Sequence, residues 1–131
     1  MVQRLQNRAA RIITGNYSRD VDGIDIVKEL GWMNVRQRRD YFTAVLVYKS
    51  LNGLAPSHIS DLYTYVRDVS TYCTRSVVTD QLSVPKVNKH MFTQSLQYNG
   101  PKLWNTLPHS LRSADTLGIF KCGCRKFILD Q

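Results

Sequence analysis

Long apolar runs are missing from this chain of 131 residues. The apolar stretch without a charged residue at 41–48 is far shorter than the roughly 20 apolar residues that a membrane-spanning helix needs. The first eight residues, Met-Val-Gln-Arg-Leu-Gln-Asn-Arg, also lack the apolar segment of a secretory signal peptide. The sequence therefore predicts an intracellular protein that has no membrane partner.

Cysteine is also scarce, with Cys73, Cys122 and Cys124 as the only three in the sequence. A low, odd count argues against a disulfide framework and suits a reducing compartment. Cys122 and Cys124 are separated by one residue, whereas the ligand pairs of structural zinc sites are usually separated by two to four. The histidines are scattered along the chain, so we expect no metal site and interpret Cys124 as a small buried apolar residue.

Motifs for nucleotide binding and for nucleophilic catalysis are absent. The seven glycines form neither G-x-x-x-x-G-K-[S/T] nor G-x-G-x-x-G, and their expected role is in turns and helix ends. No nucleophile elbow accompanies the serines and histidines. The sequence therefore predicts no cofactor, no catalytic residue and no enzymatic activity for this chain.

Basic residues, in contrast, are in excess. Eighteen lysines and arginines face ten acidic residues, which gives a formal charge of +8. Residues 1–19 hold four arginines and no acid, and the next eleven residues are net acidic. Such a surplus favours polyanionic partners, so RNA or DNA is the expected ligand class.

Apolar periodicity predicts a mainly helical fold. The expected helices run from the N-terminus to Gly15, from Asp22 or Gly23 to Gly31, over 35–52, from Ser57 through about Tyr65, and from Thr116 to the C-terminal end. Between them, 75–79 and 82–84 are rich in Val, Thr and Ser, 91–98 is a candidate to pair with one of them, and 99–101 has the composition of a turn. The predicted fold class is thus mainly α, a small helical domain with a short central β element, either a hairpin or extended strands.

Helix 35–52 has the strongest signals. Asn34 is a candidate N-cap, and Gln37 stands where a capping box places its reciprocal residue. The second half, 42–51, is apolar nearly all round, which indicates a buried central helix. In the terminal helix, one face is expected to carry the apolar residues Leu117, Phe120, Cys124, Phe127 and Ile128.

The first helix combines an apolar stripe with a basic one. Leu5, Ala9 and Ile12 recur at spacings of four and three and are expected to pack, and Arg4, Arg8 and Arg11 recur in the same way beside them. Three like charges on one stripe call for a counter-charge, which a phosphate backbone would supply. The alternative is a solvated face, or ion pairs with the acids Asp20, Asp22 and Asp25.

A second basic group, Arg36, Arg38 and Arg39, lies near the predicted start of helix 35–52. Cations are unfavourable with the helix dipole there, and a bound anion or Glu29 would relieve this. The two tryptophans, Trp32 and Trp104, can stack on bases, but packing in the core or at an interface is the simpler interpretation. The candidate nucleic-acid-binding residues are therefore Arg4, Arg8, Arg11, Arg36, Arg38 and Arg39.

An ordered series of short motifs resembles one known family. The motifs span about 3–129 and, in order, are LQNRAARIITG (5–15), LGW (30–32), RR (38–39), VYKSLNG (47–53) with AP (55–56), TRS (74–76), VP (84–85), YNGPKLWNTLP (98–108) and FK (120–121). Together they resemble the C-terminal region of the reverse transcriptase polyprotein of non-LTR, LINE-type retrotransposons, in the jockey-like group.

The resemblance implies one fragment of an RNA-directed DNA polymerase. Residues 1–15 would be a basic thumb-like helix and 22–131 a C-terminal helical domain. The polymerase signature, an aromatic-x-Asp-Asp hairpin that holds two metal ions, is absent, and no adjacent pair of aspartates occurs. We therefore expect a non-catalytic fragment that contributes to binding template RNA or target DNA, and the family implies a nuclear location. The alternative is a structural or protein-interaction module that docks on the polymerase palm or thumb without nucleic-acid contacts.

Overall fold

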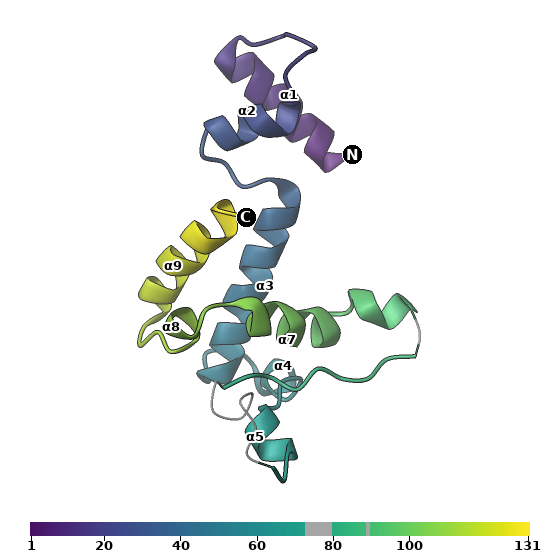
Figure 1. Ribbon diagram of the computed structural model, residues 1–131, viewed down its shortest axis with the longest axis vertical. Helices are drawn as coiled ribbons and strands as arrows, with labels where there is room; N and C mark the ends of the chain where they lie inside the picture. The colour runs from purple at the N-terminus through teal and green to yellow at the C-terminus, as the bar shows by residue number, and fades with distance from the viewer. Residues whose placement is uncertain (73–79, 89) are drawn as a thin grey trace. The chain divides into compact units, whose positions relative to one another are not determined.

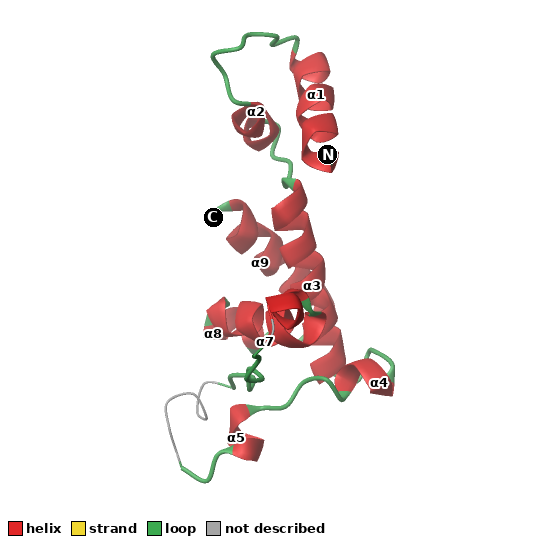
Figure 2. Cartoon of the chain, turned by 90° about the vertical axis from the view of Figure 1, so that its right-hand side faces the viewer, coloured by secondary structure: helices red, strands yellow, loops and turns green. Residues whose placement is uncertain are grey.

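Helices dominate the chain in the computed structural model, which describes residues 1–72, 80–88 and 90–131. Their order is shown in Figure 1, and Figure 2 draws helices and loops with no strand arrow in the described ranges. The elements are α1 (Val2–Thr14), α2 (Gly23–Glu29), α3 (Val35–Leu51), α4 (Ser57–Ser60), α5 (Val66–Val69), η1 (His90–Gln94), α7 (Leu96–Thr106), α8 (His109–Arg112) and α9 (Leu117–Leu129). The predicted mainly helical class is confirmed.

The chain divides into two compact units. Unit 1 consists of 1–41 and 125–131, and unit 2 consists of 42–124. Two long helices, α3 and α9, each begin in one unit and continue in the other. Ten basic and six acidic residues fall in unit 1 and eight basic and four acidic residues in unit 2, so each unit has a net charge of +4.

In unit 1, local signals set the ends of α1 and α2. Gly15 ends α1 with a φ of 66°, a left-handed conformation that glycine adopts at little cost. Asp22 caps α2, because its Oδ1 accepts the backbone N–H of Ile24 at 3.1 Å. The two helices pack around a small core of Ala10, Ile26 and Val27, with Val21 and Leu30 at its edge.

The residues that α1 buries differ from the predicted stripe. Leu5, Ala9 and Ile12 are exposed, and α1 instead directs Ala10 and a row of half-buried amide side chains inward. In α2, Ile26 and Val27 are buried, and Ile24 is exposed. Periodicity located both helices correctly, but it did not show which face of α1 would be covered.

The core of unit 2 is a stack of three aromatic side chains. Phe120 of α9 stacks on Tyr48 of α3 with ring centroids 4.4 Å apart, and Trp104 of α7 stacks on Phe120 at 5.9 Å. The hydroxyl of Tyr48 donates a hydrogen bond to the carbonyl of Ala114 at 2.7 Å. Trp104 and Phe120 are almost completely buried, so Trp104 is a core residue as predicted.

The short central β element is not shown in the described residues. The nearest feature is an isolated antiparallel bridge between Tyr65 and Leu82, and the backbone of Leu82 is also held by the Asn105 side chain at 2.8 and 2.9 Å. The stretch 75–79 lies outside the described residues. The prediction that 91–98 is extended is wrong, because these residues belong to η1 and to the start of α7.

The end of the helix at Ser57 and the structure of residues 99–101 also differ from the prediction. The helix at Ser57 ends at Ser60 instead of near Tyr65, and Pro56 occupies its N-cap position. Residues 99–101 form no turn but lie inside α7, with Pro101 buried within the helix. Gly123 lies within α9 and does not interrupt it.

Candidate nucleic-acid interface

All six predicted arginines lie in unit 1, on two helices. Because α1 is helical over 2–14, Arg4, Arg8 and Arg11 share one stripe along it. Arg4 and Arg8 are exposed, and neither forms an ion pair with any residue that the structure describes. Their guanidinium groups are therefore accessible to an external anion.

Arg11 has a different environment from the other two. Its two terminal nitrogens donate hydrogen bonds to the carbonyls of Ser18 and Val21, at 2.5 and 2.6 Å. These bonds hold the loop between α1 and α2 against the last turn of α1. They use backbone carbonyls, not the acids of this loop, which were the alternative partners considered from the sequence.

Replacing Arg11 with Gln is expected to lower the free energy of unfolding by about 1–2 kcal/mol, because two charge-assisted hydrogen bonds to the loop are lost. Arg8→Gln removes the same charge one turn earlier without losing such bonds, and its effect should stay within about 0.5 kcal/mol. Urea denaturation followed by circular dichroism measures both. Equal effects of the two substitutions would show that Arg11 does not hold the loop.

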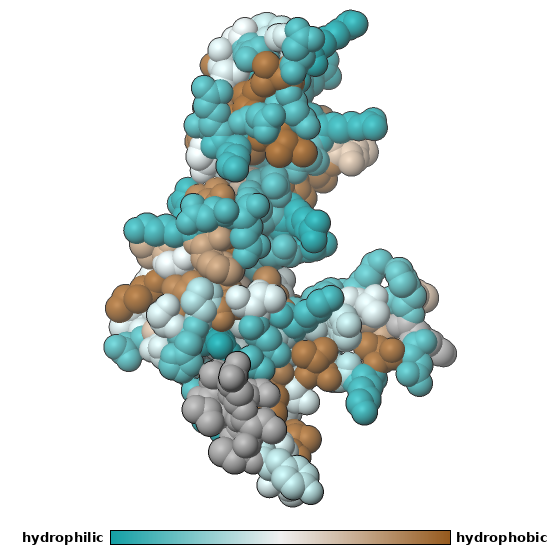
Figure 3. All heavy atoms as spheres, in the orientation of Figure 1, coloured by the Kyte–Doolittle hydropathy of each residue, from teal (hydrophilic) through white to brown (hydrophobic). Residues whose placement is uncertain are grey.

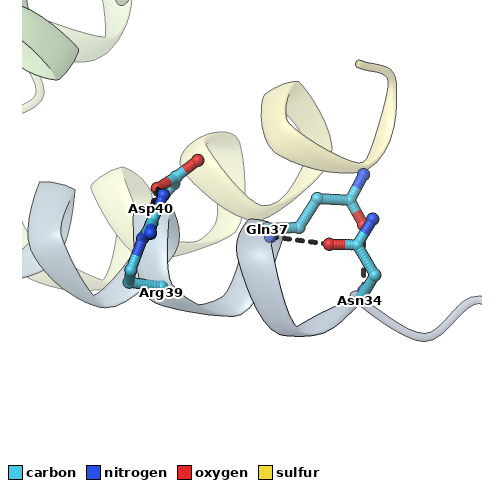
Figure 4. A network of polar contacts seen from close by, with 4 residues as sticks. All are labelled: Asn34, Gln37, Arg39 and Asp40. Carbon is cyan, nitrogen blue, oxygen red and sulfur yellow. Dashed lines mark hydrogen bonds and ion pairs between the residues drawn. The ribbon is translucent and has the colours of Figure 1, made fainter. Parts of the chain in front are cut away.

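The second arginine group lies in the first turns of α3, which begin at a complete capping box (Figure 4). Gln37 donates its backbone N–H to Asn34 Oδ1 at 2.8 Å, and Asn34 donates its own N–H to Gln37 Oε1 at 3.0 Å. This confirms the predicted cap. Gln37 also donates from Nε2 to the carbonyl of Ile128 at 2.9 Å, so the start of α3 is fixed at several points.

The three arginines of this turn differ in their partners. Arg39 pairs with Asp40 at 3.1 Å, with its side chain 71% exposed (Figure 4). Arg36 and Arg38 are exposed and form no ion pair within the described ranges. Among the described residues, Glu29 forms no ion pair with these arginines, and Asp40 offsets the unfavourable position near the helix N-terminus for Arg39.

Amide side chains connect α1 to the segment that leads into α3. Gln3 Oε1 accepts the backbone N–H of Val35 at 2.9 Å, and Gln6 donates to the carbonyl of Met33 at 2.7 Å. Gln3 also donates to Asn7 at 2.8 Å along α1. The backbone of α1 and the start of α3 are thereby held at fixed positions, and with them the two arginine groups. Spacing along the sequence gave no signal for this connection.

Trp32 lies in the segment between α2 and α3, four residues before Arg36. It is 36% exposed, so it is not a core residue, and its predicted interface packing stays a prediction. It lines a small hollow in unit 1 together with Lys28, Asn34 and Gln37. A partly exposed indole is a typical element of single-stranded nucleic-acid sites, where bases stack on aromatic rings.

The cysteines and acidic side chains, which could act as nucleophiles or metal ligands, do not gather at one place among the described residues. Cys122 is exposed and Cys124 is buried, and burial raises the pKa of the Cys124 thiol to about 11, so it remains protonated near neutral pH. Cys73 lies outside the described residues. No group of three metal-ligating side chains occurs in the part of the chain that the structure describes. Of the acids near α2, Asp22 serves as its N-cap and Asp25 lies in its first turn.

No protein family, curated protein or solved structure matches the chain. None of the described helices is long and apolar enough to cross a membrane.

Proposed function

We propose that this chain binds nucleic acid without catalysing a reaction, as a C-terminal fragment of a non-LTR retrotransposon reverse transcriptase. One observation carries the proposal. Arg4, Arg8, Arg36 and Arg38 are four exposed cations of one compact unit, and the described residues provide no acid that pairs with any of them. The ordered motifs that resemble the retrotransposon family support the biological assignment.

The expected ligand is template RNA or target DNA, held through its phosphates. Phosphate contacts supply affinity but little sequence information, so binding should be largely independent of sequence. Exposed Trp32 adds a surface on which an unpaired base can stack. In the parent polyprotein, the polymerase palm and thumb would be neighbouring partners and the nucleus the site of action.

Replacing Arg4, Arg8, Arg36 and Arg38 together with Gln tests the proposal. Binding to duplex DNA should weaken, and the slope of log affinity against log salt should decrease by up to roughly four units, near one per lost phosphate contact. Gln has a helix propensity close to that of Arg, so both helices should persist. Fluorescence anisotropy with a labelled duplex and with an unrelated single-stranded RNA, each over a series of salt concentrations, measures the slope.

The control is a variant of equal charge. Lys86, Lys121, Arg125 and Lys126 are exposed and lie outside both arginine groups, so their replacement by Gln removes four charges without removing the site. Its salt slope should remain within about one unit of the parent. If both variants flatten the slope equally, binding depends on net charge alone and the assigned site is wrong. If the parent shows no salt-dependent binding, the alternative of a structural module is favoured.

A further inference from the structure

Helix α1 buries a row of amide side chains and leaves most of its apolar side chains exposed. Gln3, Gln6 and Asn7 are half-buried and Ala10 is fully buried, and they face α2 and the segment before α3. On the neighbouring side of the helix, Val2, Leu5, Ile12 and Ile13 are each 60–63% exposed. Together with exposed Ala9, these four residues form the apolar face of α1.

This arrangement is the reverse of that in an ordinary surface helix. A helix at the surface of a globular protein normally turns its apolar stripe inward and its polar residues outward. Single exposed apolar residues need no explanation, but an aligned set along a whole helix marks a contact surface. Figure 3 shows hydrophobic side chains gathered at the surface over the α1–α2 region. Helix α1 has 13 residues, so the face is about 20 Å long, the length of a helix of three to four turns.

The charges beside the apolar face define its partner. The exposed side chains of Arg4 and Arg8 run along one border of the face, and residues 1–19 contain no acid. A second copy of this chain would bring the same arginines and no carboxylate on its own α1. A partner with apolar side chains bordered by carboxylates satisfies both features of the surface.

We propose that the apolar face of α1 docks an acidic amphipathic helix of another protein segment. Its apolar stripe would cover Leu5, Ala9 and Ile12, and its Glu or Asp residues would pair with Arg4 and Arg8. This mode of recognition places an amphipathic helix against an apolar surface through residues one turn apart. The proposal goes beyond nucleic-acid binding and does not depend on it. Carboxylates and phosphates would compete for Arg4 and Arg8, so each ligand should weaken the other by the same factor at this site.

A designed peptide provides the probe. It is an 18-residue helix of Leu, Ala and Glu, with Leu every three or four residues and Glu along one border of the Leu stripe. Two further peptides serve as comparisons: a scrambled one of the same composition and one with Lys in place of every Glu. Isothermal titration calorimetry with the full chain should show binding of the acidic amphipathic peptide and of neither comparison peptide.

Variants of the chain then locate the binding surface. Leu5→Gln with Ile12→Gln should weaken peptide binding at least about tenfold, since hot-spot side chains are lost from its centre. Val69→Gln with Met91→Gln alters two apolar residues elsewhere that are at least as exposed, and it should leave peptide binding unchanged. All four positions are exposed, so circular dichroism should show an unchanged helix content. The Leu5/Ile12 variant should also retain its salt-dependent binding to duplex DNA, which separates this surface from the arginine site.

Three results would overturn the proposal. The first is equal binding of the acidic, scrambled and basic peptides, which would show that no charge complementarity exists. The second is peptide binding that the Leu5/Ile12 variant retains. The third is a dimer of the parent chain in sedimentation velocity that the same variant converts to a monomer, because the occupant would then be a second copy.

Discussion

Replacing Trp104 with Ala is expected to lower the free energy of unfolding by about 3–5 kcal/mol, the range observed when large buried aromatics are truncated. The indole is 2% exposed and stacks on Phe120, which in turn stacks on Tyr48. Its Nε1 also donates to the carbonyl of Asp80 at 3.4 Å. Small domains are stable by only about 5–15 kcal/mol, so this single change should remove a large part of the total.

The other tryptophan is the matched control. Trp32 is 36% exposed, and Trp32→Ala removes the same side chain from a surface hollow. Its cost should be clearly smaller than that of Trp104→Ala, because about a third of the Trp32 surface is already in contact with solvent. Thermal melts followed by circular dichroism compare the two variants. Similar melting temperatures for both would show that Trp104 does not stabilise the core described above.

The helix ends were the features that the sequence predicted best, because their signals are local. The cap of α3 depends on Asn34 and Gln37, which are three residues apart and bond to each other's backbone. Gly15 ends α1 and Asp22 begins α2 through interactions within two residues of each position. Such contacts do not depend on how distant parts of the chain fold, so a short sequence window contains the information.

The buried face of α1 was not predictable in this way. Its periodicity shows an apolar and a basic stripe, and the usual expectation is that the apolar one packs. The structure instead uses Gln3 and Gln6, whose partners Val35 and Met33 lie about thirty residues further along the chain. A hydrogen bond over that separation leaves no periodic signal, so sequence reasoning assigned these glutamines no role.

The candidate site shows the same division between local and distant information. Spacing alone placed the six arginines on two helices, three along one stripe of α1 and three in the first turns of α3. It did not distinguish the exposed Arg4 and Arg8 from Arg11, which bonds to carbonyls seven and ten residues away. The conformation of the loop between α1 and α2 determines whether Arg11 finds these partners. An irregular loop has no repeating sequence pattern, so its conformation could not be predicted.

The segment 99–101 was misassigned because local propensity opposed its tertiary environment. Asn-Gly-Pro is typical of a turn, yet these residues continue α7 through Pro101. Pro101 lacks the N–H that would bond to the carbonyl of Gln97, which costs helix stability. Burial of Pro101 and close packing at Gly100 outweigh this cost, and neither can be read from the three residues themselves.

Replacing Gly100 with Ala is expected to lower the free energy of unfolding by about 1–3 kcal/mol, the cost of overpacking a filled interior. A Cβ at this position would lie 2.8 Å from Cε1 of Tyr63 and 3.1 Å from Cγ2 of Val47. The Tyr63 ring is 8% exposed and Val47 is fully buried, so neither side chain has free space to move into. In an exposed helix, replacing Gly with Ala would raise the stability by up to about 1 kcal/mol. A destabilised variant therefore indicates close packing at Gly100, and a stabilised variant indicates free space there.

Gly118→Ala supplies that reference case within the same fold. Gly118 lies in the first turn of α9, is exposed, and has no atom within 4 Å of an added Cβ. Its replacement should raise the free energy of unfolding by about 0.5–1 kcal/mol, through helix propensity alone. Urea denaturation of the two variants beside the parent should therefore give shifts of opposite sign. A stabilised Gly100→Ala variant would mean that α7 does not pack closely on Tyr63, and the turn predicted over 99–101 would then regain support.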